Sequence, residues 1–429
     1  MAGPQDAQIN ALAQSAQQFM RAGRPDDAAR IWEQVRALAP NHSQALFFLG
    51  QHALMRNRNA PVAVDFFQRA ANADPKSAVI PLNLSFAYRA LGDAQNEMAA
   101  LTRALAIDAY FYPALLSKGM LEERQGNRRL AAQTYKNVLT IAPPDDQLPE
   151  EMKKPIAHAR EVIAANAAEL ESFLSERIGR VRSRHAPEEL WRFDECRDVA
   201  AGIKKIYTQQ PTLLHFPGLP ATQYYERRHF PWLEELEAAT PAIREEVTAL
   251  MEEAKDFAPY VRHPPGVPLN QWADLNFSPK WSAYFLWQND IRNDAHCLAC
   301  PHTAAAVEAV PLSDVPSFAP TVFFSALESK TRIPPHTGVT NTRLTLHLPL
   351  IVPEGCWFRV GNETREWRQG KAWVFDDTIE HEAYNPTDQL RVILIFDIWN
   401  PHLSAAERDL VRELLVGLNA YYGGGVATL

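Results

Sequence analysis

The sequence predicts a two-part molecule: an all-α solenoid followed by an α+β domain with a strand-rich jelly-roll core. Two observations support this fold class. Over roughly the first 145 residues, equivalent positions recur every 34 or 35 residues, as in a helical repeat. From Trp281 onward, short apolar runs alternate with turn-rich connectors, which is typical of a sandwich or barrel. A chain of 429 residues is long enough for both units.

Three series of positions carry the repeat. One series closes each unit and is mostly proline: Pro40, Pro75, Ala109 and Pro143. A second is mostly alanine, the small residue expected where two helices touch: Ala28, Ala63, Glu97 and Ala131. A third is large and fills the space between repeats: Trp32, Phe67, Leu101 and Tyr135. This period and chemistry resemble tetratricopeptide repeats, and we expect three to four of them.

The repeats predict either a concave surface for a peptide or protein partner, or a stabilising cap that binds nothing. After the repeats, residues 156–181 have the pattern of a helix that would cap the solenoid. Aromatic residues and prolines become more frequent beyond it. We therefore expect a boundary near residue 185, with a helical repeat domain at 1–185 and a second domain at 186–429.

The second domain begins with an amphipathic helical pattern at residues 241–257 and ends with a helix for which Ser404 is the expected N-cap. Between them lie runs expected to form strands: residues 281–287, 321–327, 343–351, 357–360, 372–375 and 391–398. Their short lengths and polar connectors favour a helix-supported jelly roll over a parallel α/β sheet.

Composition excludes several classes. The net charge is 43 − 51 = −8, which argues against a broad nucleic-acid surface. No apolar run approaches the roughly 18 residues of a membrane span, and the N-terminus lacks the pattern of a secretory signal, so we expect a cytoplasmic protein. Four cysteines are too few for a disulfide scaffold. Cys297 and Cys300 form a CxxC flanked by histidines; a zinc site or redox pair is conceivable there, but an ordinary loop is the expectation.

Two histidines stand out in the strand-rich part. His336 lies in a turn-like segment between prolines and Gly338, and His381 follows 45 residues later. Imidazoles distant in sequence but joined by strand pairing suit iron, zinc, copper or nickel. Arg391 heads an apolar strand, and a guanidinium entering a core needs an anionic partner, either an internal carboxylate or a ligand.

Residues 281–401 resemble the aspartyl/asparaginyl β-hydroxylase family, most closely from Ser325 onward. The resemblance is carried by "PHTG" at 335–338, "FDDTIEHE" at 375–382 and "RVILIFDIWNP" at 391–401. It implies a non-haem iron oxygenase that uses 2-oxoglutarate and O2, built on a double-stranded β-helix, the cupin-like jelly roll. Tetratricopeptide repeats also accompany this domain in animal members of the family.

The resemblance also implies roles for particular residues. His336 and His381 would be the two iron ligands and the catalytic centre, with Gly338 where most related oxygenases have a ligating aspartate. Arg391, aided by Ser325, would bind the distal carboxylate of 2-oxoglutarate. His347 and Arg343, on one face of the same strand, would contact the cosubstrate nearer the iron. Thr345 departs from the arginine of animal members, which removes a positive charge expected to hold a carboxylate.

The leading functional hypothesis is therefore an Fe(II)- and 2-oxoglutarate-dependent dioxygenase that hydroxylates the β-carbon of aspartyl or asparaginyl residues in a peptide or protein. A second hypothesis replaces the peptide by a small molecule or a lipid acyl chain. A third, from a different class, is a tetratricopeptide adaptor with a degenerate oxygenase domain. His336, His381 and Arg391 count against the adaptor, because all three are present.

Overall fold

The computed structural model describes residues 4–186, 190–252 and 256–422, and it divides into two compact units, Met1–Ile203 and Lys204–Leu429. The boundary follows Ile203 and not residue 185, because the helix α10 (Trp191–Ala201) packs against α9 (Glu150–Arg182). The guanidinium of Arg182 binds the carboxylate of Asp194 across this helix pair. Within the described residues, no helix is both long and apolar enough to cross a membrane.

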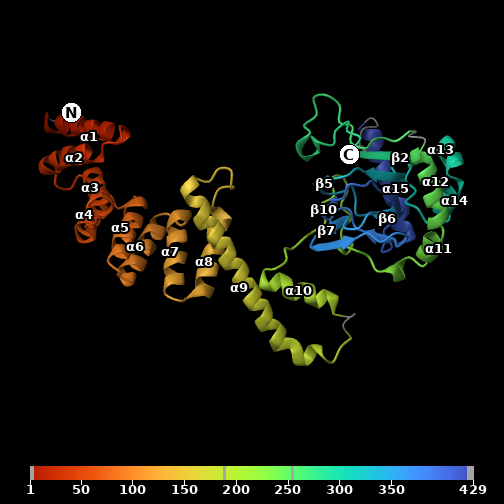
Figure 1. Ribbon diagram of the computed structural model, residues 1–429, viewed down its shortest axis with the longest axis horizontal. Helices are drawn as coiled ribbons and strands as arrows, with labels where there is room; N and C mark the ends of the chain where they lie inside the picture. Colours follow the sequence, from red (N-terminus) through yellow and green to blue (C-terminus); the bar gives the residue numbers. More distant parts are fainter. Residues whose placement is uncertain (1–3, 187–189, 253–255, 423–429) are drawn as a thin grey trace. The chain divides into compact units, whose positions relative to one another are not determined.

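The first unit is a stack of antiparallel helix pairs, seen at the red-to-orange end of the chain (Figure 1). The helices that precede α9 are α1 (Pro4–Arg21), α2 (Pro25–Leu38), α3 (Ser43–Met55), α4 (Ala60–Ala73), α5 (Val79–Ala90), α6 (Ala94–Ile107), α7 (Tyr112–Arg124) and α8 (Arg128–Ile141). The large residues of the repeat are buried as expected, at 0–3% exposure. Gly50 and Gly119 permit close packing, since a Cβ at either would collide with the ring of Phe67 or Tyr135.

The second unit has two antiparallel sheets. The large sheet has the order β1 (Ala258–Pro259), β2 (Trp281–Gln288), β4 (Val322–Leu327), β11 (Arg391–Trp399), β6 (Arg343–Ile351), β9 (Trp373–Phe375), and β3 (Ile291–Arg292) pairs with β2. The small sheet has the order β5 (Thr331–His336), β10 (His381–Asn385), β7 (Trp357–Val360), β8 (Glu363–Glu366). Successive strands from β4 to β7 alternate between the sheets, which is the topology of the predicted jelly roll.

Helices cover the outer face of the large sheet: α11 (Leu233–Ala238), α12 (Thr240–Glu252), α13 (Asp294–Ala299) and α14 (Pro301–Glu308) (Figure 1). The leucines of β6 point into this helix-covered core, so Arg343, Thr345 and His347 point to the opposite face, as the alternation predicts. The C-terminal helix α15 (Ala405–Tyr421) begins with a capping box made by Ser404 and Glu407.

The segment around Cys297 and Cys300 forms α13 and the start of α14 instead of a loop, and both thiols are buried. The two cysteines are unpaired, and burial raises the pKa of each thiol. A buried thiol with a raised pKa is unreactive, so this CxxC contributes to packing.

Candidate active site

One cavity of about 390 Å³ lies between the two sheets, and it contains all six residues that the family resemblance singles out. They reach it from the two sheets: His336 and His381 from the small sheet, and Ser325, Arg343, His347 and Arg391 from the large sheet. The sheets bring together residues that are up to 66 positions apart, such as Ser325 and Arg391.

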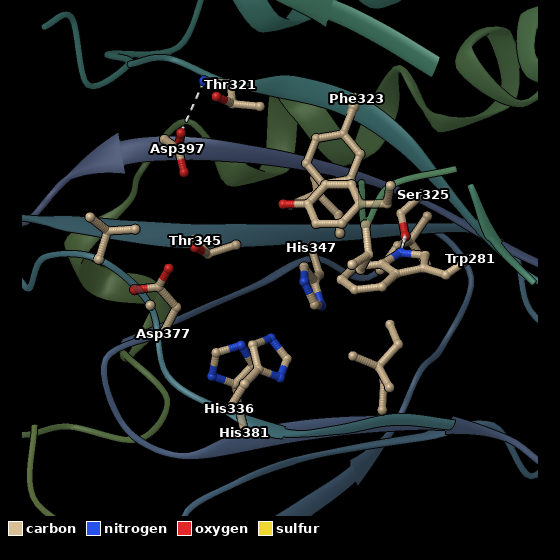
Figure 2. Close-up of a pocket in the computed structure, with 18 of the residues that line it drawn as sticks. Trp281, Thr321, Phe323, Ser325, His336, Thr345, His347, Asp377, His381 and Asp397 are labelled. Carbon is tan, nitrogen blue, oxygen red and sulfur yellow. Dashed lines mark hydrogen bonds between the residues drawn. The ribbon is translucent and has the colours of Figure 1, made fainter. Parts of the chain in front are cut away.

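The histidine pair sits where two strands of the small sheet meet. His336 ends β5, His381 begins β10, and the two residues are direct cross-strand partners with ring centroids 4.0 Å apart (Figure 2). Each Nδ1 donates to a backbone carbonyl two residues earlier, Pro334 O at 2.7 Å and Ile379 O at 3.0 Å. This fixes the tautomer and leaves both Nε2 atoms as acceptors available to a metal.

The turn expected around His336 is in fact the edge strand β5, which contains both Pro334 and Pro335. Proline cannot donate to a ladder but is tolerated at a sheet edge. Burial lowers the pKa of His336 to about 4, and burial with the neighbouring His336 lowers the pKa of His381 well below its usual value. Both imidazoles are therefore neutral near pH 7, which is the ligating form.

A carboxyl group lies beside the pair but comes from another segment. A Cβ on Gly338 would lie 2.2 Å from Cγ of Asp377, so the Asp377 side chain fills the space that a side chain at position 338 would need. The Gly338 N–H donates to the Asp377 carbonyl at 2.7 Å, and Thr345 hydrogen-bonds the Asp377 carboxyl. The Oδ1 of Asp377 has no hydrogen-bond partner, and burial raises the pKa of the Asp377 carboxyl to about 7.

Asp377 lies on the other side of the histidine pair from Ser325 (Figure 2). Asp377 precedes His381 by four residues in the chain, and its carboxyl lies against Gly338. Within the described ranges, no group of three or more His, Cys, Asp or Glu side chains is placed to hold a metal ion. The histidine pair is therefore the ligand set available there.

At one end of the cavity lies a buried cation without an anion. Arg391 is 1% exposed, and its NH1 donates to Ser325 O at 3.1 Å and Ser325 Oγ at 3.3 Å. Its Nε has no partner, and no described carboxylate forms an ion pair with it. The guanidinium lies 5.0 Å from the Trp367 ring, and burial lowers its pKa to about 9. An anionic ligand would complete this arrangement.

His347 stands between the Arg391 end and the histidine pair. Its ring lies 4.7 Å from both the Phe358 and the Phe375 rings, and its Nδ1 is buried without a partner. Burial and then the charge of Arg391 lower the pKa of His347 well below its usual value, so the ring is neutral. A neutral imidazole with a free nitrogen can hydrogen-bond a ligand that extends from Arg391 toward His381.

Arg343 lies four residues along β6 from His347, roughly 13 Å away, and it already has an anionic partner. Its NH1 is 2.9 Å from Oδ2 of Asp397, which also accepts from the Thr321 N–H at 2.9 Å (Figure 2). The sequence did not reveal this pairing, because Arg343 and Asp397 are 54 residues apart and meet only through the register of β6 and β11.

The remaining walls are aromatic. Trp281 donates from Nε1 to Ser325 Oγ at 3.0 Å, and Tyr260 stacks on Trp281 at 4.2 Å and on Phe323 at 5.2 Å. Trp272 lies 5.0 Å from the His336 ring. Trp281 is both buried and part of the cavity wall.

Two stretches of the chain match known protein families. Residues 237–401 match the family model described as aspartyl/asparaginyl beta-hydroxylase. These residues form a domain of that family. Residues 14–78 match a tetratricopeptide repeat model, so the first unit contains these repeats.

Three curated relatives show the range of the family. The mouse aspartyl/asparaginyl beta-hydroxylase is 25% identical over 94% of this chain and 56% of its own length. The human protein of the same name is 31% identical over 54% of this chain and 29% of its own. The ornithine lipid ester-linked acyl 2-hydroxylase of Rhizobium tropici is 35% identical over 45% of this chain and 66% of its own. The chain thus spans less than two thirds of the length of each relative.

Proposed function

We propose that the second unit is an Fe(II)- and 2-oxoglutarate-dependent dioxygenase that hydroxylates a C–H bond. The single observation that carries the proposal is a pair of neutral histidines with free Nε2 atoms in the same cavity as Arg391, a buried cation without a described anionic partner. The cavity lies in a domain of the aspartyl/asparaginyl β-hydroxylase family.

The residues that line the cavity fit an iron ion and 2-oxoglutarate. His336 and His381 would hold the iron through Nε2, and two protein ligands leave coordination positions for a chelating cosubstrate, water and O2. Arg391 and Ser325 would hold the distal carboxylate of 2-oxoglutarate, since a guanidinium and a hydroxyl match a carboxylate. His347 lies between these two points and would orient the cosubstrate.

Asp377, whose carboxyl fills the space beside Gly338, would hydrogen-bond water next to the histidine pair. Its unpartnered Oδ1 is an acceptor in the ionised form and a donor when protonated, and a raised pKa makes both forms accessible near neutrality. The iron and cosubstrate, when bound, supply the oxidation: O2 is consumed, 2-oxoglutarate becomes succinate and CO2, and one oxygen atom enters the substrate. The aromatic walls exclude bulk water from this reaction.

The names of the relatives suggest two substrate classes. Aspartyl and asparaginyl residues of a peptide or protein are the first, with hydroxylation at the β-carbon. The acyl chain of a lipid, or another small molecule, is the second. The aromatic lining around Tyr260 and Trp281 could pack against an acyl chain, so the lipid class is proposed on the same footing as the peptide class.

The direct test is turnover. The purified protein with added Fe(II) should convert 2-oxoglutarate to succinate in the presence of O2, slowly without substrate and faster with it. Turnover that does not depend on iron would contradict the proposal. Complete absence of 2-oxoglutarate decay and of its binding would favour the adaptor with a degenerate domain.

We also propose that the repeats bind a protein partner, because tetratricopeptide repeats commonly present a concave binding surface. Removing residues 1–203 should then weaken turnover of a protein-borne substrate by several-fold and leave substrate-free 2-oxoglutarate decay unchanged. Equal kinetics of the full and shortened chains on every substrate would reduce the repeats to a stabilising cap.

A further inference from the structure

The end of the cavity away from Arg391 has a distinct charge balance. We call it the far end and define it by Arg343, Thr345, Asp377 and Asp397. Asp397 is six residues beyond Arg391 on β11, roughly 20 Å along the strand. Figure 2 shows Asp397, Thr345 and Asp377 grouped together, with His347 and the histidine pair between them and Ser325.

The positive charge of the far end is already matched. Arg343 is the single cation of the four residues, and its side chain and that of Asp397 are 13% and 8% exposed, at 2.9 Å from each other. Because the two side chains are nearly buried, Asp397 neutralises the charge of Arg343, although the Arg343 Nε remains a buried donor without a hydrogen-bond partner.

The other two residues add no positive charge. Thr345 is 8% exposed, and its hydroxyl hydrogen-bonds the carboxyl of Asp377. Asp377 supplies no positive charge in either protonation state, and its ionised form repels an anion. A substrate carboxylate entering here would therefore lose its water, approach Asp397 and Asp377, and gain no unpaired cation, which is a costly combination.

The surfaces next to the far end are apolar. They are supplied by side chains from several segments that line the same cavity: Tyr260, Phe318, Phe323, Val339 and Ile395. Tyr260 and Phe323 are stacked at 5.2 Å, and Phe318 lies 5.3 Å from the Arg343 guanidinium, covering it. Such apolar walls are complementary to a hydrocarbon group, and the polar lining residues Arg262, Gln288 and Asn289 belong to the same cavity.

We propose that the far end receives the reacting segment of the substrate as an uncharged hydrocarbon group, a methylene of an acyl chain, and that Thr345 and Asp397 exclude a carboxylate from this position. The inference rests on the oxygenase function proposed above and narrows its substrate. The reaction balances as R–H + O2 + 2-oxoglutarate → R–OH + succinate + CO2, with one oxygen atom in the new hydroxyl and the other in succinate.

The test is a binding comparison that needs no turnover. The full-length protein is loaded with Mn(II) and N-oxalylglycine, a cosubstrate analogue, without O2. Two esters of matched length, methyl hexanoate and monomethyl adipate, are then titrated, with the fluorescence of the cavity tryptophans as the signal. They differ in whether the tip of the chain is a methyl group or a carboxylate. We expect methyl hexanoate to bind at least roughly tenfold more tightly, a difference of about 1.4 kcal/mol.

Variants of Thr345 and Asp397 test whether these residues cause the preference for methyl hexanoate. Thr345→Arg should bring monomethyl adipate to equal or higher affinity, whereas Thr345→Gln, similar in length but uncharged, should not. Asp397→Asn provides an independent route, because it keeps the side-chain shape and frees the charge of Arg343. It should also strengthen adipate binding.

Several results would overturn the proposal. One is equal or tighter binding of monomethyl adipate to the unaltered protein, and another is failure of both esters to bind. N-acetylleucinamide binding more tightly than methyl hexanoate would replace the acyl chain by an apolar peptide side chain. Failure of Mn(II) and N-oxalylglycine to bind, which is measured first, would instead contradict the proposed oxygenase function.

Discussion

Glu97 in the first unit and Arg391 in the second are both buried charged side chains, but only Glu97 has a described partner of opposite charge. In the repeats, Glu97 is 2% exposed and accepts hydrogen bonds from Arg89 at 2.9 Å and from Arg124 at 2.7 Å. In the second unit, Arg391 is 1% exposed and binds a serine but no anion. A buried charge with protein partners is compensated within the fold, whereas a buried charge without one indicates a missing ligand.

The largest expected effect concerns the histidine pair. His336→Ala or His381→Ala should abolish iron-dependent succinate formation, because one imidazole cannot fix the metal. His296→Ala is a matched control, since this imidazole stacks on Tyr284 at 3.9 Å outside the cavity. For all three variants, metal content after gel filtration measures iron binding and succinate release measures turnover. Full activity of either cavity variant would remove the basis for an iron site.

Gly338 offers the next largest effect. Gly338→Asp should lose most activity and retain metal poorly, because its Cβ would collide with Asp377 at 2.2 Å. The double variant Gly338→Asp with Asp377→Ala removes the collision and supplies a carboxylate two residues after His336. It should retain metal through dialysis better than the single variant does. Identical metal retention by the two variants would show that Asp377 does not block a carboxylate at position 338 from reaching the metal.

Replacing the two buried charges by methionine should change stability in opposite directions. Glu97→Met leaves Arg89 and Arg124 without their carboxylate and should destabilise the first unit by roughly 1–3 kcal/mol. Arg391→Met should instead stabilise the metal-free second unit by roughly 1–3 kcal/mol, because Ser325 Oγ keeps its bond from Trp281 and a desolvated charge disappears. Urea denaturation of the metal-free protein measures both; destabilisation by Arg391→Met would make Arg391 a structural residue.

A smaller effect concerns pH. Burial raises the pKa of Asp377 to about 7 in the folded chain, while an unfolded aspartate titrates near 3.9. The unfolded state therefore loses its proton first, and this group lowers stability progressively as pH rises from about 4 to 7. Asp377→Asn should remove that contribution, so the metal-free variant should gain stability over the unaltered protein as pH rises through this window. A difference that does not vary with pH would contradict the assigned burial of this carboxyl.

Regular apolar patterns made much of the fold predictable. The predicted strands at 343–351 and 357–360 match β6 and β7, because alternation follows directly from having one buried face. In the small sheet β5, β8 and β10 were missed, and in the large sheet the two-residue strands β1 and β3. β5 contains two prolines and β8, Glu363–Glu366, is polar, and edge strands need neither donors nor apolar residues on both sides.

The site was predictable in its residue types but not in its pairings. His336, His381 and Arg391 stand out because histidine and arginine are unusual in apolar strands. The Arg343–Asp397 ion pair and the place of Asp377 beside Gly338 depend on strand register, which sequence alone does not specify. These long-range pairings also determine the charge of the far end.

The most direct test of the account is whether 2-oxoglutarate supplies the anion that Arg391 lacks. Anaerobic titration of 2-oxoglutarate into the Fe(II)-loaded protein, followed by the visible charge-transfer absorption of the chelate, should show one saturable site. Arg391→Met should weaken that affinity at least roughly tenfold, since a charge-assisted contact contributes about 1.5–3 kcal/mol, and should leave Fe(II) binding intact. Unchanged 2-oxoglutarate affinity in this variant would contradict the account.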